Sequence, residues 1–377
     1  MRPTGKLHLG NYMGALANWV KLQNDEIANY ECYFFIADWH ALTTDYADTS
    51  QVAQNTLDVM FDYLGAGLDP EKSVLFLQSK VPQHTELFLA FAMITPLGWL
   101  ERIPTYKEQQ ENLTGKDLST YGFLGYPLLQ AADILLYQPQ FVPVGQDQVA
   151  HIELTREVAR RFNFFYPKLG YSPAKMLTRE EEAKAIFDMD TELAEESLFH
   201  RHESTFGKAA FSEDADRSNF VLPEPQVLLT PSPKLPGTDG RKMSKSYGNT
   251  ILLADPEPEV RKKLKTMVTD PARIRRSDPG DPDKCPVGDL HKVFSTPETM
   301  AKVYEGCRTA GIGCIECKGW AADALVQILA PIQERRASFT VPQVKEILQE
   351  GSRRAAVRAE QTMQQARAAM QLPLAGA

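Results

Sequence analysis

Two short loops in this sequence carry residue types suited to binding phosphate groups. The first, residues 4–11, surrounds His8 with Gly5 and Gly10 immediately before an amphipathic helical pattern. Small residues at the N-terminus of a helix let an anion approach backbone N–H groups, where the helix dipole also favours negative charge. Taken alone, this segment is equally consistent with an ordinary turn and helix cap.

The second loop, residues 240–249, carries two lysines and two serines between flanking glycines. Mobile positive charge and hydroxyl donors suit the negative charge that develops on a departing pyrophosphate. The alternative is a run of charged side chains that is merely solvated.

A third feature is one carboxylate in an otherwise apolar helical pattern, residues 126–137. Asp133 is its only charge, and it shares one face with Tyr126, Gln130 and Tyr137. A buried carboxylate is costly unless a donor meets it. The donor can be internal, a backbone N–H or a tyrosine hydroxyl. It can also belong to a ligand, because an indole ring offers one N–H and no acceptor, and a tyrosine substrate offers a hydroxyl.

Four of the five cysteines lie in the last quarter of the chain, at Cys285, Cys307, Cys314 and Cys317. Four thiolates can ligate a [4Fe–4S] cluster. They can also bind zinc, although structural zinc sites more often pair two C-x2–4-C knuckles, and only Cys314 and Cys317 form one. The remaining alternative is four separate core residues.

The elements that must position these residues follow an α/β order. Apolar runs at 32–37 and 73–77 predict buried strands, and 141–145 predicts a third short strand. These strands alternate with helical patterns, which favours a parallel sheet covered by helices. Pro127 predicts a first helical turn, and Asp147 predicts the N-cap of a helix over 148–162. After residue 256 the patterns are helical only, ending in a polar helix from about 341 to 370.

Composition limits the class of protein. With 377 residues, 43% hydrophobic and 24% charged, the chain is neither disordered, collagen-like nor a coiled-coil rod. The net charge, 41 − 49 = −8, excludes little, since an acidic protein can bind RNA through a local basic stripe. The longest uncharged apolar stretch, 87–100, is too short to span a bilayer, and no signal peptide is evident. We therefore expect a cytoplasmic protein without a membrane partner.

Together the two loops resemble the His-Ile-Gly-His and Lys-Met-Ser-Lys-Ser signatures of class I aminoacyl-tRNA synthetases. The second signature matches at all five positions, 242–246, and the first departs at Leu9 and Asn11 in a manner seen in the tyrosyl/tryptophanyl branch. Residues 126–137, 142–148 and 151–156, with 37–43, look like those of bacterial tryptophanyl-tRNA synthetases. The similarity covers nearly the whole chain and is weakest over 168–220.

The resemblance implies a Rossmann-like catalytic domain, an insertion and an all-helical anticodon-binding domain, at 1–167 with 221–255, 168–220 and 256–377. It implies a homodimer, with an interface around the pattern at 95–102 on a helix over 85–110; a buried core helix is the alternative there. It also implies that a short strand precedes Arg2, so we expect the native chain to begin upstream of Met1.

The implied reaction activates L-tryptophan with ATP and Mg²⁺ and transfers the acyl group to tRNA(Trp). Phosphate charge would be stabilised by His8, Lys242 and Lys245. ATP would contact Arg2, Pro3, Thr4, Gly10, Asn11, Gly145, Gln146, Asp147, Lys242, Met243, Ser244, Lys245 and Ser246. Tryptophan would contact Asp133 through its indole N–H, Gln148, His40, Tyr126, Gln130, Val142 and Val144.

The four cysteines would hold a [4Fe–4S] cluster near the anticodon, with Cys285 the least well matched and Zn²⁺ the alternative. Phosphates of tRNA would meet some of Arg273, Arg275, Arg276, Arg335, Arg336, Arg353, Arg354 and Arg358, for each of which a solvated position is the alternative. Two other functions remain open: a tyrosyl-tRNA synthetase, and a related protein that binds tRNA or amino acid without catalysis.

Overall fold

The computed structural model describes residues 1–103, 118–168, 220–230 and 235–372. Chain contacts divide it into two compact units. Unit 1 contains Met1–Asp38, Asp48–Phe76 and Leu229–Gly351, and unit 2 contains Trp39–Ala47, Leu77–Leu228 and Ser352–Ala377. The predicted insertion at 168–220 lies almost wholly outside the described residues.

The strands predicted at 32–37 and 73–77 are confirmed as β1 (Cys32–Ile36) and β2 (Ser73–Leu77), which pair in a two-stranded sheet. Every second residue of β1 is buried, whereas nearly all of β2 is buried. Helices α3 (Asp38–Asp45) and α4 (Val52–Ala66) connect the two strands, as in a βαβ unit. This arrangement agrees with the predicted α/β class.

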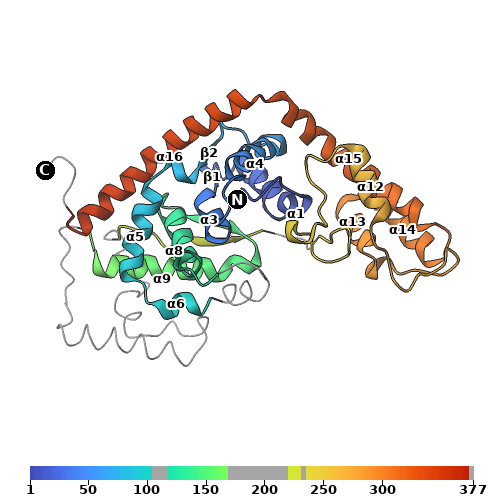
Figure 1. The fold of residues 1–377 in the computed structure, drawn as a ribbon, viewed down its shortest axis with the longest axis horizontal. Coiled ribbons are helices and arrows are strands. Elements are labelled where there is room, and N and C mark those ends of the chain that lie inside the picture. The colour runs from blue at the N-terminus through green and yellow to red at the C-terminus, as the bar shows by residue number, and fades with distance from the viewer. Residues whose placement is uncertain (104–117, 169–219, 231–234, 373–377) are drawn as a thin grey trace. The chain divides into compact units, whose positions relative to one another are not determined.

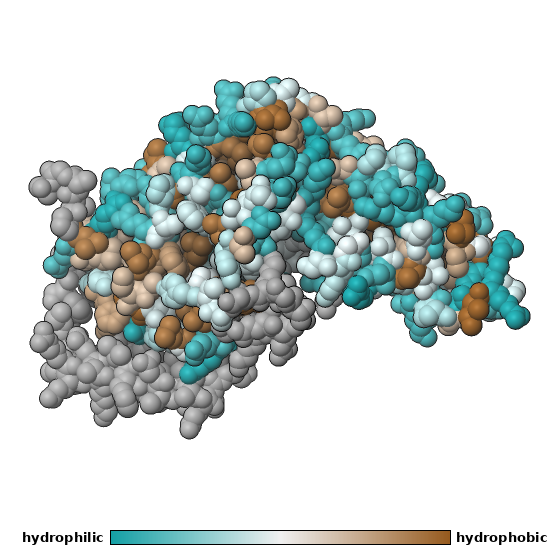
Figure 2. Space-filling view, in the orientation of Figure 1, coloured by the Kyte–Doolittle hydropathy of each residue, from teal (hydrophilic) through white to brown (hydrophobic). Residues whose placement is uncertain are grey.

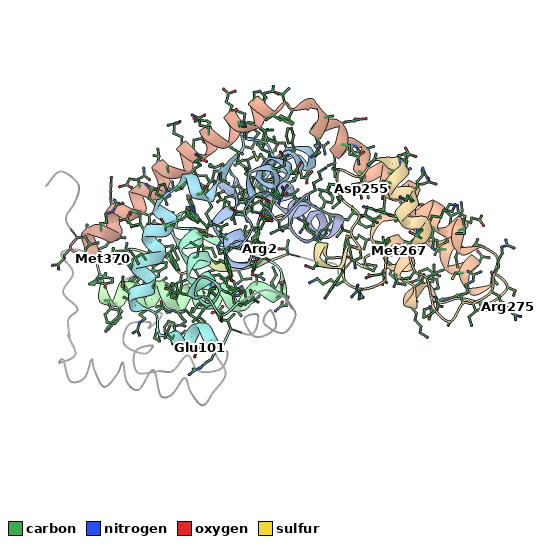
Figure 3. The ribbon with its side chains drawn as sticks, in the orientation of Figure 1. Arg2, Glu101, Asp255, Met267, Arg275 and Met370 are labelled. Carbon is green, nitrogen blue, oxygen red and sulfur yellow. The ribbon has the colours of Figure 1, made fainter. Side chains whose placement is uncertain are left out.

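The helical half of unit 1 confirms the pattern predicted after residue 256. It contains α12 (Glu257–Thr266), α13 (Pro286–Phe294), α14 (Pro297–Arg308), α15 (Cys314–Ser338) and the start of α16 (Val341–Ala369). Helix α15 packs against α4, α12 and α13 (Figure 1). Met267 is the C-cap residue after α12, and Arg275 lies in the loop that follows, far from Arg2 (Figure 3).

The helix after the first loop begins as α1 (Leu9–Asn11), widens into a π-helical turn (Tyr12–Leu16) and continues as α2 (Ala17–Gln23). The ring of Trp19 stacks on Phe34 of β1 at 4.8 Å and meets Tyr63 of α4 edge-on at 5.7 Å. Aromatic packing therefore fixes this helix against the sheet.

Unit 2 is built around helices α5 (Gln83–Ile94), α8 (Tyr121–Leu135) and α9 (Val149–Phe165), with α8 packed against both others. The strand predicted at 141–145 is present as β3 (Phe141–Val144), which pairs with β4 (Gln226–Leu229). Phe91 of α5 meets Phe162 of α9 edge-on at 5.9 Å, so an aromatic contact joins these two helices in the core of the unit.

Two predicted helix starts are wrong. Helix α8 begins at Tyr121, where the Thr120 hydroxyl accepts a hydrogen bond from the Phe123 N–H, so Pro127 lies inside the helix rather than in its first turn. Asp147 does not cap α9, because a 3-10 turn over Gln146–Gln148 precedes the helix and Gln148 occupies the N-cap position.

The helix predicted over 85–110 ends earlier. Helix α5 stops at Ile94 before Pro96, and α6 (Leu97–Glu101) follows; residues 104–110 are outside the described chain. The outer faces of α5 and α6 expose Leu89, Met93 and Leu97 by 55%, 73% and 59%, and Figure 2 shows hydrophobic surface in this region. Within the described part of the chain, no helix is long and apolar enough to cross a bilayer.

Candidate active site

The loop around His8 is clamped to a neighbouring segment of unit 1. The N–H of Leu9 donates to the carbonyl of Ile251, and the N–H of Leu253 donates to the carbonyl of Leu7. A side chain on Gly10 would place its Cβ 2.9 Å from the His8 ring, so a larger residue there would displace the imidazole. Gly5 has φ of +115°, which favours glycine for conformational reasons.

The 240–249 loop is held by a side chain that sequence reasoning missed. Asn249 is buried; its Oδ1 accepts the Ser244 N–H at 2.9 Å, and its Nδ2 donates to Asp239 Oδ1 at 2.7 Å. The Met243 N–H donates to the carbonyl of Leu235, and the Met243 side chain is buried. The Asn249 amide therefore fixes the conformation of the loop, whereas the side chains of Lys242 and Ser246 are exposed.

Lys245 joins the two predicted loops, because its Nζ donates to the carbonyl of Gly5 at 2.7 Å. The pKa of Lys245 is lowered to about 8, mainly by burial, which outweighs the opposing charge of Asp62; the nearby Arg2 charge also lowers it. Burial and the Lys245 charge lower the pKa of His8 to about 4. His8 is consequently neutral at pH 7, and it contributes an N–H dipole rather than a charge.

In unit 2, Asp133 is buried and accepts three hydrogen bonds. Its Oδ2 accepts from His40 Nε2 at 2.8 Å, and its Oδ1 accepts from His84 Nδ1 at 2.6 Å and from Gln78 Nε2 at 2.7 Å. Burial alone would raise the pKa of the Asp133 carboxyl, but His84 and His40 outweigh it and lower the pKa to about 2. Asp133 is therefore an ionised acceptor with internal donors.

Two of these donors are oriented by further contacts. Gln78 Oε1 accepts the Trp39 N–H at 3.1 Å, which leaves its amide nitrogen to face Asp133. His84 is fully buried on the first turn of α5, and its Nε2 lies 2.8 Å from the Tyr137 hydroxyl. Gln78 and His84 are not recognisable from the sequence, because they lie 55 and 49 residues from Asp133.

A second chain of contacts links residues predicted to bind tryptophan. The Tyr126 hydroxyl lies 3.0 Å from His151 Nε2, His151 Nδ1 lies 2.8 Å from Gln148 Oε1, and Gln148 Nε2 donates to Asp147 at 3.0 Å. Burial lowers the pKa of His151 to about 4, so the ring is neutral. The hydrogen-bond network then places the His151 ring proton on Nδ1, which donates to Gln148, while Nε2 accepts from the Tyr126 hydroxyl.

The remaining residues predicted to bind ATP or tryptophan are divided between the two units. Val142, Val144 and Gln130 are half-buried in unit 2. Gly145 lies against Asp147, since a Cβ there would stand 2.8 Å from Asp147 Oδ1. In unit 1, the Asn11 side chain accepts a hydrogen bond from the His8 N–H at 3.1 Å. Arg2, labelled in Figure 3, lies close enough to Lys245 to lower the pKa of its ammonium group.

The four clustered cysteines gather in unit 1. Cys285 and Cys307 are buried and Cys314 and Cys317 are half-buried. Burial raises the pKa of Cys317 to about 12, and the thiols of Cys285, Cys307 and Cys314 add to this rise. Among the described residues, however, no group of three or more His, Cys, Asp or Glu side chains is placed to ligate a metal ion.

Three of the arginines predicted to meet tRNA phosphates also make hydrogen bonds or ion pairs within unit 1. Arg273 is buried and donates to the carbonyls of Arg276 and Ile312. Arg335 donates to the carbonyl of Gly65, and Arg336 binds Asp62 and Asp58. Arg335 is nevertheless exposed, and the phosphate contacts of these three arginines stay predictions.

Comparison with known proteins places these features in a family. The family model for tRNA synthetases class I (W and Y) matches residues 1–186 and 204–330. The chain belongs to this family. The tryptophan–tRNA ligase of Ralstonia nicotianae is 48% identical, covering 99% of this chain and 97% of its own, and that of Thermotoga maritima is 46% identical, covering 99% and 98%.

Solved structures of the tRNA synthetase family agree with the fold. The tryptophanyl-tRNA synthetase of Campylobacter jejuni, complexed with ADP and tryptophan, is 28% identical with a TM-score of 0.75 and covers 99% of this chain and 98% of its own. The tyrosyl-tRNA synthetase of Archaeoglobus fulgidus, 22% identical with a TM-score of 0.56, shares the fold alone. The predicted Rossmann-like catalytic region followed by helices is thereby confirmed.

Proposed function

We propose that this chain is a tryptophan–tRNA ligase. It activates L-tryptophan with ATP to give tryptophanyl-adenylate and pyrophosphate, and it then transfers the tryptophanyl group to the 3′-terminal ribose of tRNA(Trp). The observation that carries this proposal is the 2.7 Å hydrogen bond between Lys245 and Gly5, which joins the two signature loops of the family. The choice of tryptophan is supported by the full-length ligase relatives.

In the activation step, a carboxylate oxygen of tryptophan attacks the α-phosphorus of ATP, and the bond from that phosphorus to the pyrophosphate oxygen breaks. The carboxylate is itself the nucleophile, so the protein supplies position and charge rather than a base. Lys242 and Lys245 neutralise charge on the leaving pyrophosphate, and neutral His8 donates one hydrogen bond. Mg²⁺ enters with ATP, bound by phosphate oxygens.

Unit 2 supplies the amino-acid site. An ionised carboxylate has about four acceptor positions, and three of those on Asp133 are taken by internal donors, which leaves room for one indole N–H. The oxygen atoms of Tyr126 and Gln148 are acceptors for the substrate ammonium group, because His151 fixes both side chains. Val142 and Val144 would contact the indole ring.

The four cysteines support a second, structural proposal: a [4Fe–4S] cluster held by Cys285, Cys307, Cys314 and Cys317. Their thiols influence one another's protonation, and four thiolates are the ligand set that such a cluster requires. The cluster would tie the loop before α13 to α14 and α15. Anaerobically purified protein should contain iron and sulfide and absorb broadly in the visible range, and Cys317→Ser should reduce both. Zinc without iron would replace the cluster with a zinc site.

The helical half of unit 1 offers a surface for tRNA. A depression of about 620 Å³ is lined by Arg275 and Arg276 together with Ile274 and Ile315. Arg275 and Arg276 are exposed, in contrast to buried Arg273. Positive charge beside apolar side chains suits the phosphates and bases of single-stranded RNA.

ATP–pyrophosphate exchange tests the proposed activity directly. We expect exchange that depends on tryptophan and is far weaker with tyrosine. Exchange with tyrosine alone would assign the chain to the tyrosine branch. Absence of exchange with either amino acid, together with retained tRNA binding, would favour a protein that binds without catalysis.

A further inference from the structure

Both backbone hydrogen-bonding groups of Leu7, the residue before His8, have fixed partners. The N–H of Leu7 donates to Oδ2 of Asp62 at 2.8 Å, and its carbonyl accepts from the N–H of Leu253 at 2.9 Å. Asp62 lies on α4 and is completely buried. Because buried backbone groups are strongly disfavoured without partners, the position of the His8 loop depends on Asp62 and on the segment containing Leu253.

Helix α15 holds both of these partners. Arg336 Nε donates to Oδ1 of Asp62 at 2.9 Å, so the two oxygens of this carboxylate connect Arg336 to Leu7. Three residues earlier on α15, Gln333 Nε2 donates to the carbonyls of Leu253 at 3.0 Å and Asp255 at 2.8 Å (Asp255 is labelled in Figure 3). Residues three apart share a helix face, so one face of α15 reaches both sides of Leu7.

Close packing leaves α15 little freedom to slide along α4. A Cβ on Gly65 of α4 would lie 2.9 Å from the carbonyl oxygen of Ile332, so the two backbones approach closely here. Arg335 Nε also donates to the carbonyl of Gly65 at 2.8 Å. The contacts made by Gln333 and Arg336 are therefore fixed in register.

We propose that Arg336 and Gln333 are positioning residues for the His8 loop, residues 4–11, which is predicted to bind ATP. They act on Leu7 through Asp62 and Leu253, so that the helical half of unit 1 sets the efficiency of adenylate formation. The inference rests on the proposed ligase function. Burial raises the pKa of the Asp62 carboxyl, with Arg336 and the Leu7 N–H opposing it. Losing Arg336 would therefore favour the neutral carboxyl, which is a weaker acceptor for Leu7.

The test uses the full chain and compares Arg336→Gln, Arg336→Lys and the neighbouring control Arg335→Gln. For Arg336→Gln, we expect kcat/KM for ATP in pyrophosphate exchange to fall about ten- to a hundredfold, while the KM for tryptophan changes less than about twofold. Arg336→Lys should recover part of the loss because it keeps a charge near Asp62. Arg335→Gln removes a hydrogen bond to α4 but spares Asp62, so it should change kcat/KM less than about threefold.

Melting temperatures of all variants separate positioning from general destabilisation. If Arg336→Gln does not fold, Gln333→Ala carries the test, with the same ATP-selective loss expected. Unchanged kcat/KM for ATP in the folded variant, or an equal loss in Arg335→Gln at equal stability, would overturn the inference. Calorimetric ATP binding should follow the same order among variants. It tests the positioning role even if the unmodified chain showed no exchange, a result that would contradict the proposed function alone.

Discussion

At the scale of single residues, the site depends on groups whose protonation is set by burial and by neighbours. Asp133 is buried yet ionised, because His40, His84 and Gln78 donate to it. An ionised carboxylate accepts hydrogen bonds only. For the proposed indole contact, we therefore expect Asp133 to favour a substrate ring that offers an N–H and to reject a ring that offers only an acceptor or a C–H.

This selectivity leads to a prediction for Asp133→Asn, which preserves volume but replaces one acceptor oxygen with an NH₂ group. We expect kcat/KM for tryptophan to fall by about 10²- to 10⁴-fold, since sites built around a hydrogen-bonded group discriminate by such factors. Calorimetric ATP binding should change little, because Asp133 is not among the residues predicted to contact ATP. Pyrophosphate exchange at varied tryptophan concentration measures the loss, and an unchanged kcat/KM would contradict the assignment.

Lys245 predicts a pH dependence. Its ammonium group must be charged to stabilise pyrophosphate, and burial lowers its pKa to about 8. The charged form is present below this pKa and is lost as the pH rises through it, so kcat/KM for ATP in the free enzyme should decline above about pH 8. Lys245→Arg keeps its charge throughout this range and should move the decline to higher pH.

Alanine variants test the same role without a change in pH. Lys245→Ala and Lys242→Ala should lower the rate of activation more than they weaken tryptophan binding, because the charge they stabilise develops during the reaction. Equilibrium binding and single-turnover rates separate the two effects. A variant that lost tryptophan affinity while keeping its turnover would count against a transition-state role.

Some of these residues could be selected from the sequence and others could not. His8, Lys242 and Lys245 lie in contiguous signatures, and Asp133 is the only charge in its helical pattern. His84 and Gln78 lie 49 and 55 residues from Asp133, and packing of α5 on α8 brings the first of them into contact. Asn249 resembles any loop amide until its three partners are known. Local patterns thus identify reacting groups better than the groups that orient them.

At the scale of elements, continuous apolar runs predicted strands well because burial itself defines them. β2 has the predicted bounds, and α16 ends one residue before the predicted limit. The starts of α8 and α9 were wrong because several residues near each start could cap it. Thr120 rather than the turn at Pro127 begins α8, and a 3-10 turn displaces Asp147 from the N-cap of α9. Caps therefore need three-dimensional context that periodicity lacks.

Close packing of α4 and α15 yields a stability prediction. Gly65→Ala would normally favour a helix by about 1 kcal/mol, but here the new Cβ meets a backbone carbonyl that cannot rotate away. Overpacking of this kind costs about 1–3 kcal/mol, so we expect a lower unfolding midpoint. Gly319→Ala in α15 is the matched control, because nothing lies within 4 Å of the added Cβ, and its midpoint should rise or stay unchanged.

At the scale of the whole molecule, α5 connects the amino-acid site to an exposed apolar surface. His84, Leu87 and Phe91 are buried on one face of this helix. Leu89 and Met93, with Leu97 at the start of α6, are exposed on the other. Apolar patches of this kind on soluble proteins mark interaction surfaces. A second copy of this chain is the partner that we propose, as the resemblance to a homodimeric family implies.

Charged residues on this apolar surface should prevent dimer formation. Met93→Glu, combined with Leu89→Glu, places charges where an apolar interface must exclude water, and burying them there is costly. We expect light scattering to show a dimer for the unmodified chain and a monomer for the variant. Ile27→Glu, at a side chain that is 99% exposed in a loop of unit 1, should remain dimeric.

The monomeric variant should also raise the KM for tryptophan. Helix α5 carries His84, which donates to Asp133 at 2.6 Å, so loss of support on the outer face of α5 should loosen the carboxylate that we propose as the partner of the indole. The KM for ATP should change less, since α5 contributes none of the predicted ATP contacts. A monomer with unchanged kinetics would show that the surface serves assembly alone, and a persistent dimer would place the interface elsewhere.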